Sequence, residues 1–114
     1  MSGRGKPRVL FVCSRNQWRS PTAERIYRND PRIEVRSAGV ASSAKRRLSE
    51  KDLTWADLVL VMERKHAAFI RQQYQNHPDL PALVSLDIPD EYRFMDSELV
   101  QLLRDKIESE IQDF

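Results

Sequence analysis

The chain has 114 residues, of which 40% are hydrophobic and 32% charged, and its formal net charge is +2. This length and composition suit one compact domain and exclude both a two-domain protein and an intrinsically disordered chain. The charge is divided unevenly, because residues 1–47 carry 12 Lys or Arg against three acids, whereas residues 48–114 carry seven basic and 14 acidic residues. A basic half indicates an anionic partner, which is nucleic acid, a membrane surface or a phosphate-bearing group.

The single cysteine, Cys13, excludes an intramolecular disulfide, a Cys-x-x-Cys redox pair and a zinc site built from several cysteines. No apolar run is long enough to span a membrane, and no apolar stretch of a secretory signal follows the basic N-terminus. We therefore expect a cytoplasmic protein with no membrane partner. His66 and His77 lack a ligand partner at suitable spacing, so we expect no metal and no other cofactor.

Residues 1–7 are polar and are expected to form a flexible lead-in to a single domain over 8–114. The run over 8–13 is apolar at both its odd-numbered and its even-numbered positions, which predicts a strand buried on both faces. Further strands are expected over 33–36, 57–62 and 83–86, and helices over 20–29, 48–55, 64–74 and 97–111. This alternation predicts a three-layer α/β fold, in which helices cover both faces of a four-stranded parallel sheet.

Local signals mark the ends of these elements. Ser20 is expected to cap the first helix, with Pro21 at its first position and Glu24 as an acid in its first turn. The segment 37–39, Ser-Ala-Gly, is expected to form a turn. Asp96 is expected at the N-terminus of the last helix. The buried face of that helix is predicted to consist of Leu99, Leu102, Leu103, Ile107 and Ile111.

The loop after the first strand, Cys13-Ser14-Arg15-Asn16-Gln17-Trp18-Arg19-Ser20, lies where open α/β sheets bind their ligands. Backbone N–H groups in a tight loop that enters a helix converge into an anion cradle. Arg19 can add a planar two-pronged donor to a phosphate. The predicted phosphate-binding residues are Ser14, Arg15, Asn16, Gln17, Trp18 and Arg19.

Cys13 would lie at the base of this cradle, where the same N–H groups stabilise a thiolate and Ser20 could donate a hydrogen bond to it. A thiolate that faces a bound phosphorus atom is placed for nucleophilic attack, which predicts a cysteinyl-phosphate intermediate. A lone cysteine after an apolar run is more often an inert buried residue, and Cys-x5-Arg alone occurs by chance. The preceding strand and the following helix start favour the catalytic interpretation.

The segment 9–24 resembles the phosphate-loop signature of the low-molecular-weight protein tyrosine phosphatases. Residues 35–39, 56–63 and 88–92 resemble further segments of that family in the same order. The resemblance implies that Cys13 is the nucleophile, that Arg19 clamps the phosphate and the transition state, and that Ser20 tunes the thiol. It also implies that Asn16 holds the loop in a strained shape and that Ser37 supports it, and asparagine tolerates left-handed backbone in turns.

Departure of an alkoxide or phenoxide requires a proton donor, which can then activate water. The candidates are Asp87, Asp90 and Glu91, on the loop after the fourth strand. The family has Asp-Pro-Tyr here, and aligning Pro-Asp and Tyr92 favours Asp90. Asp87 is the alternative, because Asp87-Ile-Pro could be a stretched Asp-Pro.

The family normally inserts a long segment between Gly39 and Trp55, which carries an aromatic wall for the substrate ring. Here residues 40–47 are short, basic and free of aromatic side chains. Trp18, which we expect at the rim of the site, and Tyr92 could partly replace that wall. Trp55, two residues before a strand, is expected to serve packing.

The leading hypothesis is a metal-independent, cysteine-dependent phosphomonoester hydrolase of the protein tyrosine phosphatase type, acting on a phosphorylated protein or a small phosphate ester. One alternative is an arsenate reductase that uses an external thiol, because the chain lacks the two further cysteines of the thioredoxin-coupled reaction. Another is a non-catalytic module that binds phosphate or nucleic acid. Nucleic acid is disfavoured as a partner, because aromatic residues among the arginines are few and no nucleic-acid motif is present. The sequence does not determine the oligomeric state.

Overall fold

The computed structural model describes residues 5–112, and in it strands and helices alternate along the chain. The strands are β1 (Arg8–Cys13), β2 (Glu34–Gly39), β3 (Leu58–Val61) and β4 (Ala82–Ser85). The helices are α1 (Arg19–Tyr27), α2 (Glu50–Trp55), α3 (Arg64–Gln73) and α4 (Ser97–Ile111). The predicted order of elements is confirmed, and the first four residues of the predicted lead-in lie outside the described residues.

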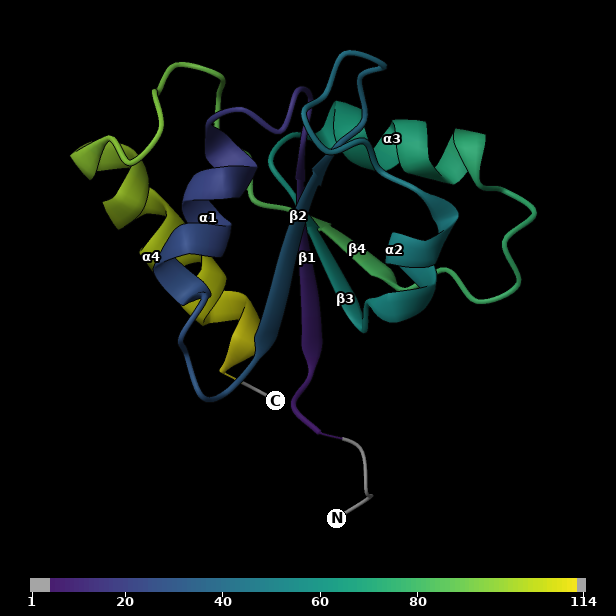
Figure 1. Ribbon diagram of the computed structural model, residues 1–114, viewed down its shortest axis with the longest axis horizontal. Helices are drawn as coiled ribbons and strands as arrows, with labels where there is room; N and C mark the ends of the chain where they lie inside the picture. The colour runs from purple at the N-terminus through teal and green to yellow at the C-terminus, as the bar shows by residue number, and fades with distance from the viewer. Residues whose placement is uncertain (1–4, 113–114) are drawn as a thin grey trace.

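The four strands form one parallel sheet in the order β2-β1-β3-β4. Helices α1 and α4 cover one face of this sheet, and α2 and α3 cover the other (Figure 1). The predicted three-layer α/β class with a four-stranded parallel sheet is therefore confirmed. Over residues 5–112, no helix combines the length and the apolar character needed to cross a membrane.

Strand β1 has apolar side chains on both of its faces, and each face packs in a separate core. Val9, Phe11 and Cys13 pack in the cluster that includes α1 and α4 residues, whereas Leu10 and Val12 pack in the cluster on the α2 and α3 side. Helix α4 buries Leu99, Leu103, Ile107 and Ile111, as its spacing predicted, while Leu102 is half-buried. Asp96 caps this helix, because its carboxylate accepts from the backbone N–H groups of Glu98 and Leu99.

Two local predictions were wrong. Helix α1 begins at Arg19 with Trp18 at the cap position, and Glu24 lies beyond its first turn. Ser20 does not cap it, because the Ser20 hydroxyl contacts the side chains of Cys13 and Asn16 instead. Residues 37–39 do not form a turn but continue β2, because they pair in parallel register with the last three residues of β1.

The sheet order places the loop after β1 at a topological switch point. The chain leaves β1 for β2 on one side and later returns to β3 on the other side of β1. In open parallel sheets, ligands bind at the carboxyl ends of the strands where the order reverses in this way. The loop over 14–18 therefore lies where the fold itself favours a site.

Candidate active site

The loop between β1 and α1 is held from outside by the segment 40–45. Three backbone hydrogen bonds join them: Val40 N–H to the Cys13 carbonyl (3.0 Å), Ala41 N–H to the Ser14 carbonyl (2.8 Å) and Lys45 N–H to the Arg15 carbonyl (3.0 Å). Within the described part of the chain, none of the backbone N–H groups of residues 14–19 donates a hydrogen bond. The loop therefore has its first carbonyls satisfied and its amides available, which is the donor arrangement that an anion requires.

Asn16 shapes the loop from within. Its φ of 53° is left-handed, a conformation that asparagine tolerates better than most residues. Its side-chain amide is buried and donates to the hydroxyl oxygens of Ser20 (2.9 Å) and Ser37 (3.0 Å). The Ser37 hydroxyl in turn donates to Glu24 at 2.5 Å. Asn16 thus lies behind the loop, where it fixes the backbone turn together with Ser37.

Cys13 ends β1 at the base of the loop, and only 3% of it is exposed. Its Sγ lies 2.9 Å from the Ser20 hydroxyl oxygen. Because the Asn16 amide donates to that same oxygen, the Ser20 hydroxyl hydrogen is left to point toward the sulfur or the more distant Ala38 carbonyl (3.4 Å). This hydroxyl can therefore donate a hydrogen bond to a thiolate at Cys13.

Arg19 is 2% exposed and is held by residues that follow β3 and β4. Its Nη1 donates to the Ile88 carbonyl at 2.7 Å and lies 3.3 Å from Glu63 Oε1. Its Nε lies 3.7 Å from Asp90 Oδ1. Burial raises the pKa of Glu63, but the attraction of the Arg19 and Lys65 cations outweighs it and leaves that pKa below its ordinary value. The guanidinium is therefore fixed beside an ionised carboxylate.

A small cavity of about 50 Å³ opens inside the loop, which is room for roughly four water-sized groups. Its walls are formed by Cys13, Ser14, Arg15, Gln17, Trp18, Arg19 and Asp90. A phosphoryl group, with one phosphorus and three oxygens, matches this size. Asn16 is the one predicted phosphate-binding residue that does not line the cavity.

The two candidate acids lie in different places. Asp90 lines the cavity and is half exposed, with 55% of its side chain accessible. Asp87 lies outside it, where its carboxylate accepts from the Ser85 hydroxyl (2.7 Å) and lies 3.5 Å from Arg64. Tyr92 does not line the cavity either, and its hydroxyl donates to Glu98. Trp18 lines the cavity, and Trp55 packs beside the second core.

Glu63 and His66 are near the loop although the sequence motifs did not single them out as functional residues. Both follow β3, whose carboxyl end adjoins that of β1 in the sheet. Burial lowers the pKa of His66 to about 4, and the nearby Arg19 cation adds to this shift. Glu63 and His66 could have been predicted from the adjacency of β1 and β3, but that adjacency is known only once the strand order is known. Over residues 5–112, no group of three or more His, Cys, Asp or Glu side chains is placed to hold a metal ion.

A larger groove of about 410 Å³ adjoins the cavity and shares Gln17 and Trp18 with it. Phe94, which is 44% exposed, lines this groove. Of residues 40–47, only Lys45 lines it, so that segment contributes no aromatic side chain. The Thr22 hydroxyl donates to the Trp18 carbonyl (2.6 Å) and accepts from Met95 N–H (2.9 Å). This hydroxyl ties the loop between β1 and α1 to the segment that carries Phe94.

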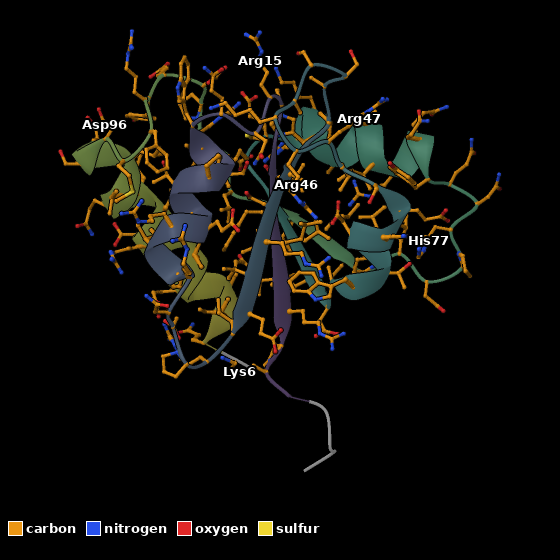
Figure 2. The ribbon with its side chains drawn as sticks, in the orientation of Figure 1. Lys6, Arg15, Arg46, Arg47, His77 and Asp96 are labelled. Carbon is orange, nitrogen blue, oxygen red and sulfur yellow. The ribbon has the colours of Figure 1, made fainter. Side chains whose placement is uncertain are left out.

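Three exposed cations lie in or near the walls of the cavity and the adjoining groove. Arg15 projects outward at the carboxyl end of the sheet, the end opposite to Lys6 (Figure 2). Lys45 adjoins it through the backbone hydrogen bond, and the Arg93 guanidinium lies 5.9 Å from the centre of the Trp18 ring. None of these three cations forms an ion pair with a described residue. The cavity mouth is therefore favourable for an anion.

Gly39 allows β2 to approach the loop. A Cβ atom at this position would lie 2.6 Å from the Ser14 carbonyl oxygen, 2.7 Å from the Ala44 Cβ and 2.8 Å from the Asn16 nitrogen. Two of these neighbours are backbone atoms of the loop, which cannot move aside as a flexible side chain can. We expect Gly39→Ala to lower the free energy of unfolding by about 1–3 kcal/mol and to weaken phosphate binding, as measured by chemical denaturation and phosphate titration. Wild-type phosphate affinity in the variant would contradict this prediction.

Comparisons with known proteins show what the sequence and the fold of this chain resemble. Residues 8–50 match the family model of the low molecular weight phosphotyrosine protein phosphatases. The arginine phosphatase YwlE from Geobacillus stearothermophilus is 26% identical, with a TM-score of 0.72 and 94% of each chain covered. The low-molecular-weight protein tyrosine phosphatase from T. tengcongensis is 27% identical, with a TM-score of 0.70 and coverage of 92% of this chain and 99% of that one.

A third structure, Wzb from Vibrio vulnificus in complex with benzylphosphonate, shares the fold at 24% identity and a TM-score of 0.75, with 96% of this chain and all of that chain covered. No curated protein sequence matches the chain. The chain thus combines a parallel α/β sheet with a Cys-x5-Arg loop at its topological switch point. The chain is similar to the low molecular weight phosphotyrosine protein phosphatases in sequence over residues 8–50, and its fold is similar to the folds of the arginine and tyrosine phosphatases named above.

Proposed function

We propose that the protein is a metal-independent phosphomonoester hydrolase of the protein tyrosine phosphatase type, acting on an aryl phosphate in a protein or a small molecule. One observation carries this proposal: the Cys13 sulfur lies at the base of a cavity whose loop amides have no partner among the described residues. Arg19 and Asp90 form the walls of the same cavity. A nucleophile, an anion site and a proton donor thus converge on a space of phosphoryl size.

In the first step, the loop amides and Arg19 hold the phosphoryl oxygens and stabilise the charge that develops on them. The Cys13 thiolate attacks phosphorus, so that an S–P bond forms as the bond from phosphorus to the ester oxygen breaks. Asp90 transfers its proton to the departing oxygen, which leaves as a neutral phenol. The product is a cysteinyl phosphate with Asp90 ionised.

In the second step, the ionised Asp90 takes a proton from a water molecule as the water oxygen attacks phosphorus. The P–O bond forms while the S–P bond breaks, which releases inorganic phosphate and restores the Cys13 thiolate. The Ser20 hydroxyl, 2.9 Å from the sulfur, would stabilise this thiolate as it leaves. A reducing compartment such as the cytoplasm keeps Cys13 in the thiol form that both steps need.

The cations near the cavity favour a phosphate ester over a phosphorylated arginine. Arg15 lines the cavity beside Asp90, Lys45 lines the adjoining groove and Arg93 lies over Trp18, and these three cations have no ion-pair partners among the described residues. A guanidinium leaving group is cationic and would be repelled by them, whereas a phenol is neutral. Trp18 and the exposed Phe94 offer apolar surface for an aromatic ring beside the cavity. The Vibrio vulnificus structure holds benzylphosphonate, which also carries an aromatic ring.

The test is hydrolysis of p-nitrophenyl phosphate, a phosphotyrosine peptide and the matching phosphoarginine peptide, all in the presence of a metal chelator. We expect the first two to be cleaved and the phosphotyrosine peptide to be cleaved more efficiently than the phosphoarginine peptide. A preference for the phosphoarginine peptide would overturn the ester assignment. Phosphate binding without cleavage of any substrate would favour a binding module, and arsenate reduction in the presence of an added thiol would favour the reductase alternative.

A further inference from the structure

His66 lies beneath the phosphate loop, and the proposed reaction assigns no role to it. It belongs to the first turn of α3 and is 1% exposed. Both of its ring nitrogens are hydrogen-bonded. Nδ1 accepts from the Glu63 backbone N–H at 3.1 Å, and Nε2 lies 2.9 Å from the Ser14 hydroxyl oxygen.

The first of these bonds determines the tautomer of the ring. A backbone N–H can only donate, so Nδ1 must carry the lone pair and the ring hydrogen of the neutral imidazole must be on Nε2. The pKa of about 4, which follows from burial and from the Arg19 cation, keeps the ring neutral near pH 7. The charged groups that face it are Arg19, Glu63, Lys65 and Asp90. Nε2–H is therefore the donor in the bond to Ser14.

This direction has a consequence for Ser14, which lines the cavity. Its hydroxyl oxygen accepts from His66, and its backbone carbonyl accepts from Ala41 N–H at 2.8 Å. A serine hydroxyl has one hydrogen to donate, and no hydrogen bond within residues 5–112 uses it. The hydroxyl hydrogen and the Ser14 amide are thus both left as donors beside the cavity.

We propose that the Ser14 hydroxyl donates a hydrogen bond to a phosphoryl oxygen bound in the loop, and that His66 is the positioning residue that orients it. Glu63 completes the arrangement, because its backbone N–H holds the His66 ring while its carboxylate lies 3.3 Å from Arg19. The segment after β3 would therefore orient the Ser14 hydroxyl, which is one side-chain donor to the phosphoryl group. The same segment lies next to Arg19, which is the other. This inference rests on the proposed phosphate site at Cys13.

The test uses Ser14→Ala, His66→Leu and His66→Gln, with inorganic phosphate as the probe and p-nitrophenyl phosphate as the substrate. We expect Ser14→Ala and His66→Leu each to lower phosphate affinity and kcat/KM by about tenfold, because each removes the same bond to a charged oxygen. The phosphate affinity and kcat/KM of the double variant should be no lower than those of the more impaired single variant. His66→Gln, whose side-chain amide can replace the Nε2 donor, should recover part of the loss.

A spectroscopic measurement separates this role from a purely structural one. In ¹⁵N–¹H spectra of the wild type, the His66 Nε2 resonance should shift when phosphate is added, and in Ser14→Ala it should not. His77→Gln is the matched control, because His77 also bonds a hydroxyl through Nε2, that of Thr54 at 3.1 Å, and lies away from Arg15 (Figure 2). We expect this control to bind phosphate as the wild type does.

Ser14→Ala keeps the test decisive if His66→Leu fails to fold, because Ser14 is only half-buried. Phosphate affinity of Ser14→Ala within twofold of the wild type would overturn the inference, as would additive losses in the double variant. Another outcome is that the wild type cleaves no ester while Ser14→Ala still binds phosphate tenfold more weakly than the wild type. That result would reject the proposed function and support this inference. The two failures are therefore distinguishable.

Discussion

Replacing Cys13 with serine is expected to lower kcat for p-nitrophenyl phosphate by about ten-thousandfold or more, because it removes the proposed nucleophile. A serine hydroxyl at neutral pH is far less ionised than a thiol and is also the poorer leaving group in the second step. The loop amides and Arg19 do not depend on the sulfur, so the variant should still bind inorganic phosphate. The measurement is steady-state hydrolysis together with a phosphate titration of the same sample.

Because Cys13 is the one cysteine of the chain, the nucleophile can also be tested in the wild type. Iodoacetamide should modify a single site and abolish hydrolysis, and inorganic phosphate should slow the modification by occupying the cavity. Rapid acid quenching during turnover should trap one phosphoryl group on the wild-type chain. Hydrolysis that survives either Cys13→Ser or complete alkylation would reject the nucleophile assignment.

Replacing Asp90 with asparagine is expected to lower kcat for phenyl phosphate by about a hundredfold, because the departing phenoxide loses its proposed proton donor. Asp90 lines the cavity, and its Oδ1 lies 3.7 Å from Arg19 Nε. The loss should be smaller for p-nitrophenyl phosphate, because p-nitrophenoxide departs more readily without a proton. The ratio of the two losses therefore reports on the acid and not on folding.

Asp87→Asn is the matched control for this experiment. Asp87 lies three residues earlier on the same loop, is exposed, and bonds the Ser85 hydroxyl outside the cavity. We expect its effect on kcat to be less than twofold with both substrates. A greater loss for Asp87→Asn than for Asp90→Asn would move the proton donor to Asp87.

The elements whose signals are local could be predicted from the sequence. The two-sided apolar run of β1 and the apolar spacing of Leu99, Leu103 and Ile107 in α4 depend on residues close together in the chain. The Cys-x5-Arg loop between a strand and a helix is also a local pattern, so its position at the end of β1 was predictable. The alternation of these elements was sufficient for the fold class, because parallel strands need helical connections.

The two errors have one cause. Serine is a residue type that favours helix N-caps, and the Ser-Ala-Gly sequence of residues 37–39 is typical of a turn. In the folded chain, the Ser20 hydroxyl is within hydrogen-bond distance of Cys13 and Asn16, and residues 37–39 pair with β1. Local propensity is a weak preference that tertiary contacts override. The contacts that override it here are those that build the loop between β1 and α1.

The sequence by itself therefore determined the α/β class, the single thiol and the loop that carries it. The sequence favoured Asp90 over Asp87 only by resemblance, and the tertiary structure placed Asp90 at the cavity and Asp87 outside it. The tertiary structure also brought His66 to Ser14 across 52 positions of the chain. The physical reason is that secondary structure responds to the periodicity of neighbouring residues. The groups around the cavity are brought together by the strand order β2-β1-β3-β4, which no local pattern encodes.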